Sequence, residues 1–173
     1  MPNHVVNELY FKCKNKTELN KIMEAIKGDD GRAIDFEKIV PIPDYIFRGN
    51  LGTAERELYG ENNWHDWSCE NWGTKWNAYQ TCELDNGVEF LTAWSAPFPV
   101  IQKLSEMFPT VEITHYFADE DIGFNCGKFT YIGGEEHDDS DFEDGTKESV
   151  KFACDMWGYD YEEFEQYFKE QYV

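Results

Sequence analysis

Apolar and polar residues alternate along several short stretches of the chain, which is the pattern of half-buried β-strands. In residues 4–12, Val5 and Leu9 fall on one side of the predicted strand and Glu8 on the other. Residues 111–117 alternate in the same way, and a further strand is predicted over 128–132.

A β-hairpin is predicted where two such stretches, 78–84 and 88–94, flank the dipeptide Asn86-Gly87. Asparagine and glycine tolerate the positive φ angles of a type I′ turn, which suits the twist of paired strands. We therefore expect a two-residue turn centred on Asn86-Gly87.

Apolar residues at helical spacing predict two helices between these strands. The first should begin at the cap Thr17 and end at Gly28, and the second should lie between Pro97 and Pro109. A short helix is predicted over 53–59, and two more should start at the caps Thr146 and Asp160.

Without residues 30–75, these elements follow the order β-α-β-β-α-β, which is the ferredoxin-like pattern of an α+β domain. We expect an antiparallel sheet with both helices on one face and the other face open. The predicted ferredoxin-like domain covers 1–133, with a tryptophan-rich insertion at about 30–75 that packs on or beside the sheet. An acidic loop over 134–145 and C-terminal helices over 146–173 complete the chain, and these helices should dock onto the domain.

The net charge of −20 excludes whole classes of partner. Phosphate backbones are bound through lysine and arginine, so direct binding to nucleic acid or to anionic membranes is not expected. From Asp119 onward there are 17 acidic and 4 basic residues, which concentrates the charge toward the C-terminal end. The predicted acidic interaction surface consists of Glu135, Glu136, Asp138, Asp139, Asp141, Glu143 and Asp144.

Composition also indicates a cytoplasmic protein. No apolar run approaches the roughly 20 residues that span a bilayer, and the N-terminus has no signal-peptide pattern. The five cysteines are scattered and odd in number, which indicates reduced thiols that serve as small buried hydrophobes.

Several segments resemble the YubB ferredoxin-like family of plasmid- and bacteriophage-borne proteins of unknown function. The most specific is Asn-Trp-Gly-Thr-Lys-Trp-Asn-Ala at 71–78. The other matching stretches are 1–5 with Asn7, 34–36, 41–43, 92–97 and Gly123-Phe124. The resemblance implies a ferredoxin-like fold and an origin in a mobile element, and it implies no activity.

The block Trp72–Ala78, which we call the tryptophan block, admits two interpretations. It could form a binding site with Lys75 and Asn77 as polar anchors and the rings as walls. Alternatively it forms the entry into the hairpin, where Gly73 permits a bend and Trp72, Trp76 and Trp94 pack together as core. The candidate binding residues are Trp72, Gly73, Thr74, Lys75, Trp76, Asn77 and Trp94.

No catalytic, metal or cofactor motif stands out. An EF-hand starting at Asp139 fails, because Asp144 stands where glycine is required and Val150 where a bidentate glutamate belongs. The histidines lack metal-ligand spacing, and no serine or cysteine lies in a nucleophile motif. An enzyme of unknown class remains open, because catalytic groups can converge from distant positions.

These observations favour a non-enzymatic accessory protein of a phage or other mobile element, acting in the bacterial cytoplasm by protein–protein interaction. The expected partner is a basic protein, for example a host factor that binds nucleic acid. In a sharper alternative, the carboxylates mimic nucleic-acid phosphates and inhibit a host defence nuclease of the restriction or CRISPR type. In the plainest alternative, the acidity serves solubility alone.

Overall fold

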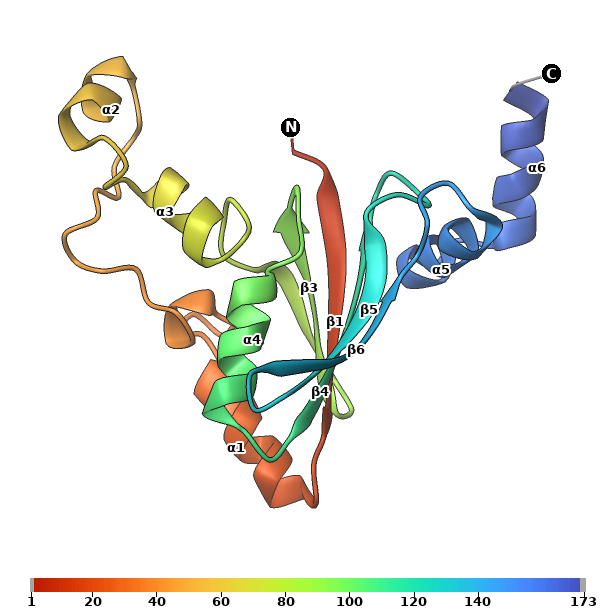
Figure 1. The fold of residues 1–173 in the computed structure, drawn as a ribbon, viewed down its shortest axis with the longest axis horizontal. Helices are drawn as coiled ribbons and strands as arrows, with labels where there is room; N and C mark the ends of the chain where they lie inside the picture. Colours follow the sequence, from red (N-terminus) through yellow and green to blue (C-terminus); the bar gives the residue numbers. More distant parts are fainter. Residues whose placement is uncertain (1, 172–173) are drawn as a thin grey trace.

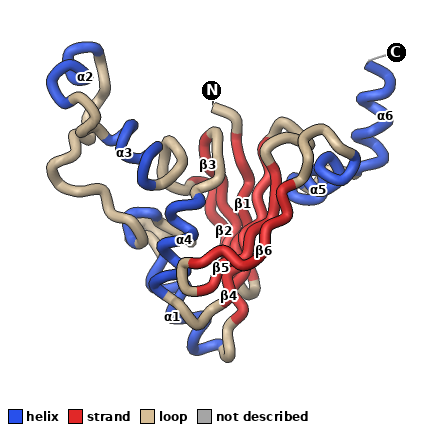
Figure 2. Tube along the Cα trace, viewed as in Figure 1, coloured by secondary structure: helices blue, strands red, loops and turns tan. Residues whose placement is uncertain are grey.

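The strands of the structure, a computed structural model, form one six-stranded antiparallel sheet in the order β2-β3-β1-β4-β5-β6 (Figure 2). The structure describes the backbone of residues 2–171, and the side chains of these residues except 138–141 and 167–171. The strands are β1 His4–Lys12, β2 Tyr79–Leu84, β3 Gly87–Ala93, β4 Glu112–Asp119, β5 Cys126–Ile132 and β6 Glu135–Asp141.

The expected ferredoxin-like arrangement is confirmed by the four strands β4-β1-β3-β2 and the two helices that connect them. Helix α1, Lys16–Ile26, follows β1, and α4, Phe98–Met107, follows β3. Both helices lie on the same face of the sheet (Figure 1). Strands β5 and β6 extend this core beyond β4.

The main hydrophobic core lies between the sheet and these two helices. Leu9, Phe90 and Ile113 from the strands are fully buried, as are Ile22 from α1 and Leu104 from α4. The alternation of apolar residues along the strands predicted this face correctly. The first helix differs from the prediction at its start, because Asn15 rather than Thr17 caps it by accepting a hydrogen bond from the Glu18 amide at 3.0 Å.

The hairpin turn is one residue earlier than expected. Its loop is Asp85-Asn86, because Leu84 pairs with Gly87, and Gly87 is the first residue of β3. None of these loop residues has a positive φ, so the type I′ prediction was wrong. Gly87 serves a different purpose: a Cβ there would lie 1.8 Å from the carbonyl oxygen of Leu9 in β1.

The insertion forms an arm of the molecule (Figure 1). It contains a short 3-10 helix, η1 Phe36–Lys38, and the helices α2 Thr53–Tyr59 and α3 Trp64–Asn71. Trp64 and Trp67 of α3 pack against the main core, whereas α2 has no buried residue. The part of the insertion that holds the tryptophans therefore lies beside the sheet, as expected.

The second face of the sheet is partly covered by α5, Lys147–Trp157, and is therefore not fully open. Ala153 of α5 packs with Val6, Ala118 and Cys126 in a second, smaller core. The indole N–H of Trp157 donates to the carbonyl oxygen of Asp119 at 2.9 Å and so anchors the end of the helix. The last helix, α6 Tyr161–Gln171, continues away from the sheet and forms the other arm (Figure 1).

The segment predicted as an acidic loop contains a strand. Residues Glu135–Asp141 form β6, which pairs with β5 and is the outermost strand of the sheet. Backbone pairing satisfies the N–H and C=O groups of β5, and acidic side chains do not prevent it at a solvent-exposed edge. Charged residues are one of the means by which proteins protect such edges from further pairing.

Candidate functional site

The block Trp72–Asn77 is largely a structural junction. The Trp72 ring is buried, and its indole N–H donates to the carbonyl oxygen of Val40 at 2.8 Å. Gly73 has φ +74°, and Pro99 of α4 occupies the space a Cβ would need. The buried Thr74 hydroxyl donates to the carbonyl oxygen of Ala93 at 2.8 Å. These contacts join the insertion to β3 and α4.

Asn77 ties the hairpin to the start of the insertion. Its side-chain oxygen accepts hydrogen bonds from the amides of Phe36 at 2.9 Å and Ala78 at 2.8 Å. Its side-chain nitrogen donates to the carboxylate of Asp35 at 2.6 Å. The amide group of Asn77 therefore holds two chain segments together, and this use competes with a role as a ligand anchor.

The remaining members of the candidate binding set lie at the surface. Lys75 places its ammonium 4.7 Å from the centroid of the Trp76 ring. Trp76 is 37% exposed and Trp94 is 53% exposed, so the expectation that they pack with Trp72 as core was wrong. Trp94 has φ +73°, a left-handed backbone conformation that is uncommon for a residue other than glycine, at the end of β3.

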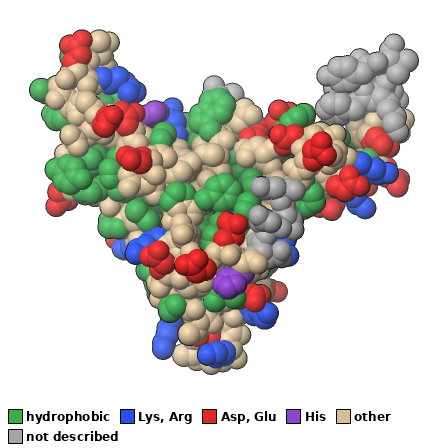
Figure 3. Space-filling view, in the orientation of Figure 1, with side chains coloured by type: hydrophobic (Ala, Val, Ile, Leu, Met, Phe, Trp, Pro, Cys, Tyr) green, Lys and Arg blue, Asp and Glu red, His purple; other side chains and the backbone are tan. Residues whose placement is uncertain are grey.

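The predicted acidic surface lies along the outer edge of the sheet and just beyond it. Glu135 and Glu136 at the start of β6 are exposed, and so are Glu143 and Asp144 after the strand. Asp144 accepts a hydrogen bond from the Asn125 amide at 3.2 Å. The side chains of Asp138, Asp139 and Asp141 lie outside those that the structure describes. Figure 3 shows further acidic side chains on both arms, so carboxylates also occur away from this edge.

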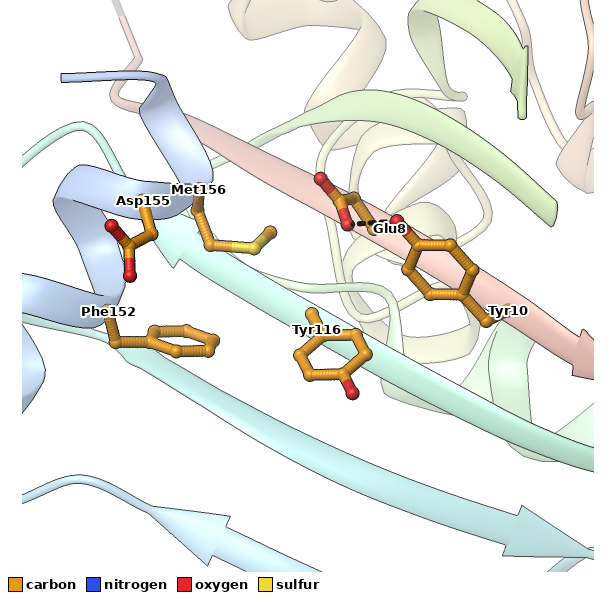
Figure 4. A pocket seen from close by; sticks show the side chains of 6 residues that line it. All are labelled: Glu8, Tyr10, Tyr116, Phe152, Asp155 and Met156. Atoms are coloured by element: carbon orange, nitrogen blue, oxygen red, sulfur yellow. Dashed lines mark hydrogen bonds between the residues drawn. The ribbon is translucent and has the colours of Figure 1, made fainter. Parts of the chain in front are cut away.

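A hollow on the second face of the sheet was not predicted. It has a volume of about 510 Å³ and lies between β1, β4 and the docked helix α5 (Figure 4). We refer to it as the aromatic hollow, and it is lined by Glu8, Tyr10, Tyr116, Phe152, Asp155 and Met156. The strand residues alternate outward from the main core, so the sequence places them on this face. The docked helix α5 supplies the other wall of the hollow, which stays open to solvent.

Aromatic rings form most of the lining of the aromatic hollow. The rings of Tyr10 and Tyr116 meet edge to face with centroids 5.8 Å apart, and the rings of Tyr116 and Phe152 are stacked at 6.3 Å. From β5, the ammonium of Lys128 lies 5.9 Å from the centroid of the Tyr116 ring. Such ring faces attract cations through their quadrupoles.

The charged groups around the aromatic hollow are mainly carboxylates. The Tyr10 hydroxyl donates to Glu8 at 2.8 Å. Burial raises the pKa of Tyr10 to about 12, and the hydrogen bond and negative charge of Glu8 act in the same direction. Tyr10 is therefore a neutral donor at physiological pH. Glu89 of β3 lies directly opposite Glu8 in the antiparallel register, and Asp155 is exposed on the α5 side.

This lining contains groups that can bind a cation or an apolar group. Its residues are carboxylates, a methionine and aromatic rings, and they include no serine, cysteine or histidine. More widely, the described part of the chain contains no group of three or more histidine, cysteine or acidic residues that could hold a metal ion.

Residues 71–169 match a sequence family described as the ferredoxin-like domain in Api92-like protein. The chain belongs to this family. The match covers more than half of the chain and includes β2 to β6, α5 and most of α6. It confirms the ferredoxin-like part of the resemblance, whereas the finer YubB assignment stays a prediction. The description of the family gives a fold and no reaction.

Among solved structures, the chain is similar to the crystal structure of a protein api92 from Yersinia pseudotuberculosis, with 20% sequence identity and a TM-score of 0.42. The similarity covers 65% of this chain and 40% of that chain, so this chain matches less than half the length of that protein. No curated protein matches the chain. None of the helices in the described residues is long and apolar enough to cross a membrane.

Proposed function

We propose that this protein is a non-enzymatic accessory protein that binds a basic partner protein through its acidic surface. The observation that carries this proposal is the charge: 35 acidic residues against 15 basic ones, with a net charge of −20. Such a surface attracts positively charged partners from a distance and speeds their association. It repels nucleic acids and anionic membranes for the same reason.

The position of β6 gives the acidic surface a defined geometry. Glu135 and Glu136 lie on the outermost strand of the sheet, where a partner can approach without displacing another element. The rest of β6, up to Asp141, lies on the same edge of the sheet. A partner with a complementary basic groove could therefore contact an extended acidic segment.

The extended backbone of β6 favours a second candidate, a nucleic-acid-mimicking inhibitor of a host defence nuclease of the restriction or CRISPR type. Alternate residues of a regular strand lie on one face about 6.6–6.8 Å apart, so acidic residues of β6 would form a row of negative charge, which a register irregularity between Glu136 and Asp138 interrupts. The acidic composition of Glu135–Asp141 would place negative charge along this backbone.

Affinity capture from a bacterial lysate tests both candidates. The immobilised protein should retain a basic partner at about 50 mM NaCl and release it at about 500 mM NaCl, because salt screens exposed charges. A variant with Glu135→Gln, Asp138→Asn, Asp139→Asn and Glu143→Gln should lose the partner. The matched control carries Glu57→Gln, Glu61→Gln, Glu70→Gln and Asp85→Asn, which neutralises four exposed carboxylates elsewhere and should retain it.

The outcomes separate the candidates. Release of the captured partner by added duplex DNA or RNA supports mimicry, whereas retention supports a different binding surface on the partner. If no protein is captured, or if capture does not depend on salt, the acidic surface is not a binding surface and the proposal is wrong.

A further inference from the structure

Two like charges face each other on the second face of the sheet, at the edge of the aromatic hollow. Glu8 of β1 and Glu89 of β3 are directly opposite in the antiparallel register. Like charges in this arrangement destabilise a sheet. Among the described residues, no lysine or arginine forms an ion pair with either carboxylate. A cation bound here would remove the repulsion.

The surroundings of this pair suit a cation that is also partly apolar. Next to Glu8, the hollow is lined by the aromatic rings of Tyr10, Tyr116 and Phe152 (Figure 4). The Tyr10 hydroxyl is already hydrogen-bonded to Glu8, so it orients the carboxylate and is not free to recognise an anion. Asp155 adds a third carboxylate from the opposite wall.

One cation of the chain already lies on this face, because Lys128 is directly opposite Tyr116 in the β4–β5 register. The ammonium of Lys128 lies 5.9 Å from the centroid of the Tyr116 ring. Lys128 comes from β5 and is not among the residues that line the hollow, whose charged members are both acidic. The lining of the hollow therefore carries two carboxylates and no cation, and Glu89 lies opposite Glu8, so negative charge predominates at this site.

We propose that the aromatic hollow receives an arginine side chain of the basic partner protein. This inference rests on the proposed function, and it names the group that the partner would insert. A guanidinium group is flat, weakly hydrated and able to stack on aromatic rings while it pairs with carboxylates. The volume of about 510 Å³ is ample for one such side chain.

The test uses three blocked peptides in which glycine alternates with arginine, with lysine or with citrulline, the neutral analogue of arginine. Met156 lines the hollow, so its labelled methyl group, assigned with the Met156→Leu variant, reports binding by NMR. The arginine peptide should shift this resonance with a saturable dependence on concentration. The lysine peptide should bind several-fold more weakly and the citrulline peptide should leave the resonance unchanged.

A double variant, Glu8→Gln with Glu89→Gln, should weaken binding of the arginine peptide about tenfold or more, because it removes the facing carboxylates. Glu57→Gln with Glu61→Gln, which changes the net charge equally on the insertion, should weaken it less than about twofold. Equal effects of the two pairs, or equal binding of arginine and citrulline peptides, would overturn the inference.

The two proposals fail in different ways. If the double variant still captures the basic partner from lysate with undiminished salt dependence and affinity, the hollow is not the arginine site and the acidic-surface proposal stands. If the variant with changes at 135, 138, 139 and 143 captures the partner as well as its matched control does, the acidic-surface proposal is wrong, whatever the hollow binds.

Discussion

His115 illustrates at the level of single residues how this core accommodates polar groups. Its imidazole is fully buried on β4, where one ring nitrogen, Nε2, lies 3.0 Å from the side-chain oxygen of Asn7. Because the Asn7 nitrogen donates to Val5 and Thr92, its oxygen is the acceptor and Nε2 of His115 carries the proton. The other ring nitrogen has no hydrogen-bond partner among the described residues.

The stability of the protein should therefore depend on His115 at acidic pH. Burial lowers the pKa of His115 from 6.5 to about 3 in the folded protein. Between about pH 6.5 and pH 3 the unfolded chain binds a proton at this histidine that the folded chain does not. The free energy of unfolding therefore decreases by about 1.4 kcal/mol for each unit by which the pH is lowered. Above pH 6.5 neither state binds this proton, so His115 no longer makes the stability depend on pH.

Denaturant unfolding at several pH values between 6.5 and 4.5 measures this dependence. The slope should be shallower by about 1.4 kcal/mol per pH unit in His115→Phe than in the wild type. His137→Gln, which changes an exposed histidine, serves as the control and should keep the wild-type slope. Equal slopes in His115→Phe and the wild type would contradict the prediction, and so would an NMR titration of His115 near pH 6.

At the level of elements, the prediction from sequence succeeded where local pattern decides the structure. The alternation in β1 and β4 and the helical stripes of α1 and α4 gave the core face, because burial on one side requires that period. The turn of the hairpin was misplaced, since the glycine at 87 is required by β1, which is distant in sequence. The strand β6 was missed because its acidic residues have low strand propensity, whereas pairing with β5 is a tertiary effect.

Gly87 provides a test of this close approach between strands. A Cβ at position 87 would lie 1.8 Å from the Leu9 oxygen, and β1 cannot move without disturbing its pairing with β4. Gly87→Ala should lower the free energy of unfolding by about 3 kcal/mol or more, at the upper end of the cost of overpacking. Gly31→Ala is the matched control, because Gly31 has φ +90° with nothing within 4 Å, and it should cost only about 1–2 kcal/mol. Chemical denaturation of both variants compares them, and a smaller loss for Gly87→Ala would show that the strands can separate.

At the scale of the whole molecule, composition predicted properties that the fold alone does not determine. The charge of −20 follows from the sequence, and so does its excess toward the C-terminal end. The aromatic hollow could not be predicted, because Glu8 and Tyr116 are brought together by the sheet while Asp155 and Met156 arrive with α5. The tryptophans of the candidate binding set differ in their surroundings, because Trp72 is buried at a junction whereas Trp76 and Trp94 are exposed.

The net charge leads to a prediction for the stability of the whole chain. A folded protein with a charge of −20 is destabilised by repulsion among its carboxylates, and salt screens that repulsion. Raising NaCl from about 20 mM to about 500 mM at pH 7 should therefore stabilise the protein by about 1 kcal/mol or more, which corresponds to a rise in Tm of roughly 2–4 °C for a chain of this length. Differential scanning calorimetry measures the shift.

The variant with four neutralised carboxylates at 57, 61, 70 and 85 should have a higher Tm in low salt and a smaller response to NaCl, because less repulsion remains to be screened. A salt response that is equal in the two proteins would indicate a general salt effect on hydrophobic burial instead. A Tm that falls with salt would mean that ion pairs such as Lys12–Glu112 and Arg48–Glu37 outweigh the repulsion.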